Sequence, residues 1–261
     1  MFPVGVYDVE DYPLNWIDGT YYSTYKDNIF QVSSIENVKS EADYAAVTII
    51  NLSNQSLTTN FTNTLLSKFT NLQYLYCGDN NITVLDVSNL VNLTHLSCQV
   101  NGINVLDVSN LVNLQNLSCS VNNISLLDTS NLVNLTYLNC QNNNISVLDL
   151  SNSVNLTDLF CQVNNISILD IFNLVNIQTL YCRTNNISVL DTSNSVNLTI
   201  LDCRFNQLDA ATNSQILIDL DGHGQSNGLL SSSIFGGGSL TAAGQTAKSN
   251  LLSKGWTIVG I

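Results

Sequence analysis

The sequence is poor in charge, and especially in basic residues. Lys and Arg total 7 against 20 Asp and Glu, so the formal net charge is −13, and only 10% of the 261 residues are charged. An ordinary soluble domain has about a quarter. Because a large negative surplus disfavours nucleic acid and anionic membrane surfaces, we expect neither as a partner.

Targeting and membrane-spanning segments are also missing from the pattern. No run of about eighteen apolar residues occurs, so no membrane insertion is predicted. The N-terminal stretch MFPVGVYDVEDYPLNW has neither the basic region nor the apolar region of a signal peptide. We therefore expect a chain that remains in the cytosol after synthesis, or one that is released by another route such as cell lysis.

Residue combinations typical of enzymes are scarce. The two histidines, His95 and His223, are far apart, and His95 is expected at an exposed strand position. No Ser-His-Asp order, phosphate-binding loop or nucleotide fingerprint stands out. The stretch DLDGHG, residues 219–224, lacks the remaining ligands of a calcium loop and predicts a turn. The sequence thus predicts no enzyme activity, no catalytic residues, no cofactor and no metal.

What the sequence has instead is a repeat of 21 residues, visible first in its seven cysteines. Leucine and asparagine columns keep the same step. The columns are Cys77, Cys98, Cys119, Cys140, Cys161, Cys182 and Cys203; Asn80, Asn101, Asn122, Asn143, Asn164, Asn185 and Asn206; and Leu75, Leu96, Leu117, Leu138, Leu159, Leu180 and Leu201.

The frame L-x-x-L-x-C-x-x-N-x-I-x-x-L-D-x-S resembles the leucine-rich repeat L-x-x-L-x-L-x-x-N-x-L, with Cys in the third leucine place. The resemblance covers roughly residues 47–210 and is strongest to short repeats of bacteria and phages. It implies an α/β-solenoid that is mostly β, a right-handed array with a parallel sheet on its concave face. Because the unit is short, we expect turns or 3₁₀ pieces on the outer side.

Departures from the repeat divide the chain. We predict an N-terminal arm or cap (1–46), a degenerate first repeat (47–71), the repeat array (72–206) and a small helical C-terminal cap (207–261). In the first repeat, the leucine places are taken by Ile50, Leu52 and Leu57, and the ladder asparagine by Gln55. Residues 61–69 could form a short helix.

The C-terminal cap carries its own start and stop signals. Asp209 is a plausible N-cap for a helix that runs to about Leu220. A second helix should end at Gly255 and be followed by a strand from Trp256.

The repeated polar columns have a structural and a chemical interpretation. The cysteines fit a buried column of small side chains better than a zinc site, which needs closely spaced pairs. The asparagines can satisfy backbone groups between coils. A third column could bind calcium as a ladder, although turns to the following Ser are favoured. Its members are Asp86, Asp107, Asp128, Asp149, Asp170 and Asp191.

Function is expected at strand positions that vary between repeats, because inward positions hardly vary. Aromatic and arginine side chains among them suit a protein or glycan partner. The candidate binding residues on the concave face are Tyr137, Phe160, Tyr181, Arg183 and Arg204. The N-terminal arm offers a competing docking set, Tyr7, Trp16, Tyr21 and Tyr22.

Three functions remain open at this level. The resemblance to phage-borne repeats favours a non-enzymatic virion component, such as a tail, fibre or capsid-surface protein, assembled in the host cytoplasm. Its partners would be other virion proteins or a host-surface protein or glycan. The alternative is a leucine-rich-repeat adhesin at the bacterial cell surface or secreted. A polysaccharide-active enzyme is the remote alternative.

Overall fold

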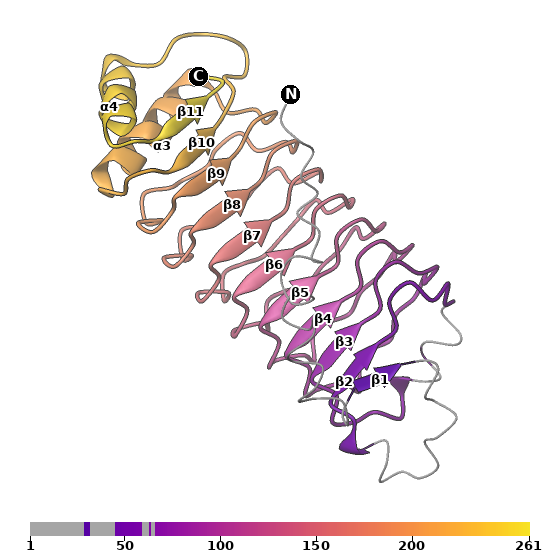
Figure 1. Cartoon of the computed structure of the whole chain (residues 1–261). Helices are drawn as coiled ribbons and strands as arrows, with labels where there is room; N and C mark the ends of the chain where they lie inside the picture. Colours follow the sequence, from indigo (N-terminus) through magenta and orange to yellow (C-terminus); the bar gives the residue numbers. More distant parts are fainter. Residues whose placement is uncertain (1–28, 32–44, 59–62, 64–65) are drawn as a thin grey trace.

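The computed structural model describes residues 29–31, 45–58, 63 and 66–261, which form a parallel β-solenoid. Each coil adds one three-residue strand to a single sheet whose strand order follows the sequence. Figure 1 shows the coils stacked into an elongated array with two helices at its C-terminal end. The strands of the array are β1 (Ile29–Gln31), β2 (Ile49–Asn51), β3 (Tyr74–Tyr76), β4 (His95–Ser97), β5 (Asn116–Ser118), β6 (Tyr137–Asn139), β7 (Asp158–Phe160), β8 (Thr179–Tyr181) and β9 (Ile200–Asp202).

The register of the sheet follows the 21-residue repeat. Leu75 pairs with Leu96, and Leu96 pairs with Leu117, so identical positions lie side by side in neighbouring strands. The central leucine of each strand from β3 to β9 points inward and is almost completely buried. One coil could not bury this apolar surface alone, and stacking completes the core.

The cysteine column lies in that core, as predicted. All seven cysteines are free thiols with no exposed surface. Burial raises the pKa of Cys77, Cys140 and Cys203 to about 12, because the thiolate would lose its hydration. The column therefore packs as small apolar side chains rather than as a ligand set.

The asparagine column joins each coil to the one before it. Asn122 donates from Nδ2 to the carbonyl oxygens of Cys98, Cys119 and Ser120, all at 3.1 Å, and its Oδ1 accepts the amide N–H of Ile103 at 3.0 Å. These bonds satisfy backbone groups that the short strands leave unpaired. The sequence prediction of an inter-coil role is confirmed.

The outer side of the array is built from turns, as the short repeat predicts. Leu90 and Leu93 donate their amide N–H to Val87 and Leu90 respectively, each at 2.9 Å, which closes two successive turns. No helix covers this side within residues 67–206. An additional ladder runs along it, in which exposed asparagines such as Asn113 donate to a carbonyl of the preceding coil, here Val91 at 3.2 Å.

The degenerate first repeat differs from its prediction at one position. Ile50 and Leu52 are buried in the leucine places. Gln55, however, is exposed, and its side chain donates within its own coil to the carbonyl oxygen of Ser53, while its backbone N–H donates to Asn80 Oδ1 of the next coil at 3.1 Å. The side chain of Gln55 therefore does not bridge two coils as the ladder asparagines do. There is no described preceding coil of the same kind to receive a second bond. Of the nine residues 61–69, where a short helix was expected, four lie outside the described residues, and Asn63 and Leu66 are helical.

The C-terminal end contains both expected helices and one strand that was not expected. The elements are α3 (Ala210–Gly222), β10 (Leu229–Ser231), α4 (Ala242–Ser253) and β11 (Thr257–Val259). Asp209 caps α3 by accepting the amide N–H of Thr212 at 2.8 Å. Strand β10 pairs with β9 and β11, and its short sequence, Leu-Leu-Ser, has no strand signal of its own.

This end of the chain also completes the outer ladders of the array. Gln225 donates to the carbonyl oxygen of Val196 at 3.1 Å, and His223 Nε2 lies 3.1 Å from that of Ser193. The stretch 219–224 is thus the end of α3 and its C-cap rather than an isolated turn. Asp221 binds Lys254 at 2.5 Å and Asn250 at 2.8 Å, which joins α3 to α4.

Candidate functional site

The strand face is the surface formed by side chains that point away from the core along the sheet. It has three columns, one before the inward leucine, one after it, and one after the cysteine. The columns are Tyr74, His95, Asn116, Tyr137, Asp158, Thr179 and Ile200; Tyr76, Ser97, Ser118, Asn139, Phe160, Tyr181 and Asp202; and Gly78, Gln99, Ser120, Gln141, Gln162, Arg183 and Arg204.

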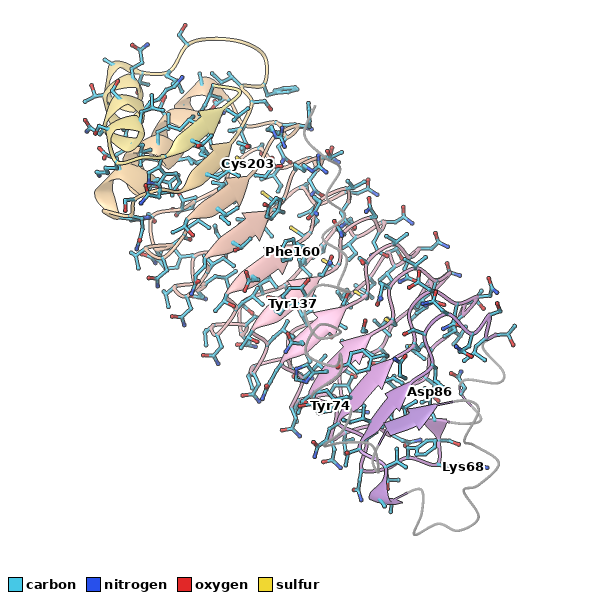
Figure 2. All side chains as sticks on the ribbon, in the orientation of Figure 1. Lys68, Tyr74, Asp86, Tyr137, Phe160 and Cys203 are labelled. Atoms are coloured by element: carbon cyan, nitrogen blue, oxygen red, sulfur yellow. The ribbon has the colours of Figure 1, made fainter. Side chains whose placement is uncertain are left out.

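Three of the candidate residues form one aromatic ladder across β6, β7 and β8. The ring centroids of Tyr137 and Phe160 are 5.5 Å apart with a 42° tilt, and those of Phe160 and Tyr181 are 5.3 Å apart with a 13° tilt. Figure 2 shows Tyr137 and Phe160 next to each other on the sheet. Residues from three coils thus meet because the strands pair in register, with Phe160 opposite Tyr181.

The two candidate arginines meet around Asp202, which pairs with Tyr181 in the sheet. Arg204 binds this carboxylate through two bonds, Nε to Oδ1 at 2.9 Å and Nη2 to Oδ2 at 2.7 Å. Arg183 Nε lies 3.8 Å from the same carboxylate. Donation of these two bonds to the Asp202 carboxylate raises the pKa of Arg204, so its guanidinium stays charged.

Asp202 is the site residue that sequence reasoning missed. It is 4% exposed, although it lies on the outward side of its strand. The signal was present, because Arg183 and Arg204 occupy the same place in adjoining repeats and two adjacent cations need an anion between them. The guanidinium of Arg204 binds this carboxylate in a bidentate manner, which makes the ion pair strong and fixes its orientation.

A second stack lies toward the N-terminal end of the face. The rings of Tyr74 and His95 are 4.4 Å apart with a 22° tilt. His95 is therefore half-buried, and the expected exposed position was wrong because flanking strands cover the ring. Its ring nitrogens lie 2.9 Å from Thr94 Oγ1 and 2.9 Å from Asn116 Nδ2, and desolvation lowers its pKa.

The aspartate column binds its own backbone. Asp128 Oδ1 accepts the amide N–H of Ser130 at 3.0 Å, and Asp107 Oδ1 accepts both the N–H and the hydroxyl of Ser109. Bonds from these serines lower the pKa of both carboxyl groups. Within the described residues, no group of three or more His, Cys, Asp or Glu side chains could hold a metal ion. The aspartates are thus turn residues in each coil.

The N-terminal candidates lie outside the described residues. Tyr7, Trp16, Tyr21 and Tyr22 therefore remain a prediction, and so does the choice between a cap and a docking arm for residues 1–46. Among the residues that the structure describes, no helix is long and apolar enough to cross a membrane.

Three of the solved structures with the same architecture come from bacteria. The functional domain of InlJ from Listeria monocytogenes, which includes a cysteine ladder, is 29% identical with a TM-score of 0.63, covering 85% of this chain and 54% of that one. A leucine-rich-repeat protein of Leptospira interrogans is 22% identical with a TM-score of 0.68, covering 82% of this chain and 55% of that one. Internalin C2 from Listeria monocytogenes is 24% identical with a TM-score of 0.52, covering 66% and 77%.

This chain is a leucine-rich-repeat β-solenoid, and its resemblance at the sequence level is confirmed. It spans about half the length of the InlJ and Leptospira structures. No protein-family model matches the sequence, and a comparison with curated proteins found no match. The virion assignment finds no counterpart among the three structures described above.

Proposed function

We propose that this chain is a non-enzymatic, protein-binding scaffold that uses the strand face of β6 to β9. The observation that carries the proposal is the aromatic ladder of Tyr137, Phe160 and Tyr181. It lies beside a group of charged side chains, the Asp202 cluster, which consists of Arg183, Asp202 and Arg204. Tyr and Arg are enriched among residues that dominate binding energy at protein interfaces. Much of the remaining face is short and polar, so it supplies fit rather than anchors.

The geometry of the ladder favours a protein over a glycan. The rings of Phe160 and Tyr181 are stacked nearly parallel, and the tilted ring of Tyr137 lies on the other side of Phe160, because β7 lies between β6 and β8. Ring edges are therefore what the ladder presents outward. Edges and phenol groups suit contacts with peptide side chains and backbone, whereas stacking of a flat ligand requires an open ring face.

The bacterial cell surface is the location we propose. The support is the likeness to the Listeria proteins InlJ and internalin C2 and to the Leptospira leucine-rich-repeat protein, which all come from bacteria. The virion assignment rests on features of the sequence alone, among them the resemblance to phage-borne repeats. The adhesin alternative is therefore the better supported of the two.

Paired variants test the binding surface. Wild-type chain and a Phe160→Ala/Tyr181→Ala variant would be applied to a protein array and to a glycan array. We expect spots on the protein array that the variant loses, with affinity reduced at least about thirtyfold, because an interface anchor contributes about 2 kcal/mol or more.

The matched control is Leu126→Ala/Val147→Ala, which removes two apolar side chains that are 68% and 66% exposed away from the strand face. It should keep all binding. Binding confined to the glycan array, or equal loss in both double variants, would refute the proposed surface. Detection of the chain in purified virions but not in a bacterial envelope fraction would restore the virion assignment.

A further inference from the structure

The chain contains only two arginines, and both lie in the Asp202 cluster. Arg183 and Arg204 occupy the same column in adjoining coils of a chain whose net charge is −13. Neighbouring strands of a sheet are about 4.8 Å apart, so the two cations would repel without a counter-ion. Asp202 supplies one negative charge, which leaves the cluster with a surplus of one positive charge.

The two arginines are held differently. The guanidinium of Arg204 donates two hydrogen bonds to the Asp202 carboxylate, and its side chain is 29% exposed. Arg183 is 43% exposed and approaches Asp202 only to 3.8 Å, beyond hydrogen-bond distance. Among the described residues, no hydrogen bond from its guanidinium is found, so its donors remain available to a ligand.

The uncompensated charge borders the aromatic ladder directly. Tyr181 pairs with Asp202 in the sheet and stacks on Phe160. Arg183 follows Tyr181 by two residues on the same strand face. An apolar anchor and a cation therefore lie next to each other on a surface that is otherwise neutral or acidic.

We propose that this part of the strand face recognises an acidic segment of the partner protein, in which a carboxylate lies next to an aromatic or aliphatic side chain. The inference rests on the proposed protein-binding function and names the chemistry of the partner. Arg183 binds the carboxylate, and the aromatic ladder contacts the apolar side chain. Charge-assisted bonds from guanidinium to carboxylate are strong and directional, which suits this role.

Arg204 and Asp202 act as positioning residues in this arrangement. Arg204 neutralises Asp202, which would otherwise repel an incoming carboxylate. The bidentate bond from Arg204 also holds the Asp202 side chain beside Arg183. The surplus positive charge is thereby concentrated on Arg183.

Two arginines make the test unusually direct, because the Arg Nε–Hε region of a ¹⁵N NMR spectrum of the full chain contains only two signals. Arg183→Lys and Arg204→Lys variants assign them. The probes are the capped peptides Phe-Glu-Phe and Phe-Gln-Phe, which differ only in one negative charge. We expect the acidic peptide to shift the Arg183 signal progressively and the Arg204 signal little, and the neutral peptide to bind at least about tenfold more weakly.

A pair of charge variants gives the control. Arg183→Gln and Lys68→Gln each remove one positive charge, but Lys68 lies at the N-terminal end of the array (Figure 2). Only Arg183→Gln should weaken the acidic peptide about tenfold. Equal binding of the two peptides, equal effects of the two variants, or no shift with either peptide would overturn the inference.

The outcome separates this inference from the function on which it rests. If Arg183→Gln keeps full binding on the protein array while Phe160→Ala/Tyr181→Ala loses it, the scaffold binds protein and the acidic-segment inference is wrong. If the Phe160→Ala/Tyr181→Ala variant also keeps full binding, the proposed surface itself is wrong.

Discussion

Asn143 donates from Nδ2 to the carbonyl oxygen of Cys119 in the preceding coil and to that of Cys140 in its own coil, both at 3.0 Å. Its Oδ1 accepts the amide N–H of Ile124 at 3.0 Å. One buried side chain thus joins two coils through groups that have no strand partner. The stability of the array depends on this repeated contact as well as on the leucine core.

Replacing Asn143 with Asp tests that dependence. The variant would keep an acceptor for Ile124 but would place a buried carboxylate against carbonyl oxygens, so we expect a loss of about 3 kcal/mol or more. Urea unfolding measures it. The control is Asn144→Asp at the next, exposed position, where the same charge change should cost less than about 0.5 kcal/mol. Similar losses in both variants would contradict the ladder.

Repeated positions were predictable because repetition itself is the signal. The Cys column, the Asn ladder and the outer turns follow from a unit of 21 residues. In such an array each inward side chain packs against the equivalent side chains of the neighbouring coils. Contacts made once in the chain were not predictable in the same way. Strand β10 (Leu229–Ser231) forms because it pairs with β9 and β11. The bidentate bond from Arg204 to Asp202 depends on the rotamers of the two side chains.

The candidate site was predicted as a set of residues but not as an arrangement. In-register strands bring Phe160 opposite Tyr181, and this follows from the repeat. The half-burial of His95 does not, because it depends on the ring of Tyr74 in the adjoining coil. The position with positive φ in each coil was also not predicted. Val occupies this position in three coils, and Val is not a residue that signals a turn.

Those left-handed positions predict an unusual stabilising change. Val121 has φ 53° and is 42% exposed, and Asn142 occupies the same place in the next coil with φ 53°. A β-branched residue is strained there, whereas Asn tolerates the conformation. Val121→Asn should therefore raise the free energy of unfolding by about 1 kcal/mol.

Two further variants control for surface polarity and direction. Val112 is 47% exposed and is not among the positive-φ residues, so Val112→Asn should bring no comparable gain. Asn142→Val should lose about as much stability as Val121→Asn gains. A gain in Val112→Asn equal to that in Val121→Asn would point to solubility rather than backbone strain.

The buried thiols predict slow chemistry in the folded chain. Burial raises the pKa of Cys140 to about 12, so the reactive thiolate is scarce at neutral pH, and reagents cannot reach the sulfur. Thiol titration should find most of the seven cysteines unreactive until denaturant is added. Cys140→Ala should cost roughly 1 to 2 kcal/mol through lost burial and a small void. Rapid labelling of all seven in native buffer would contradict the column.

Removal of divalent metal ions should leave the melting temperature unchanged. The aspartates that could form a calcium ladder instead accept bonds from their own turns, as Asp128 does from Ser130. A ligand that binds only the folded state raises its stability in proportion to RT ln(1 + [L]/Kd), so stripping a bound ion would lower Tm. Calorimetry with and without chelator measures this, and a drop of several degrees would revive the calcium interpretation.

His95 should make stability depend on pH in the mildly acidic range. Asn116 Nδ2 donates to Nε2, which leaves Nδ1–H to donate to Thr94 Oγ1, whose own hydroxyl lies 3.2 Å from the Gln73 carbonyl oxygen. This chain of bonds requires the neutral ring. Desolvation lowers the folded-state pKa below the usual 6.5, so the unfolded chain binds more protons between the two values.

Stability linked to His95 is therefore fully present above pH 6.5 and is lost as the pH falls through the folded-state pKa. Subtracting the pH profile of His95→Gln, measured by urea unfolding, isolates this contribution from that of His223 and the carboxylates. The wild type should gain stability relative to the variant as pH rises, and the ¹³Cε1 NMR signal of His95 should titrate with a midpoint below 6.5. A midpoint above that value, or a difference profile that falls with rising pH, would show that the ring is charged and that the hydrogen-bond order from Asn116 to Gln73 runs differently.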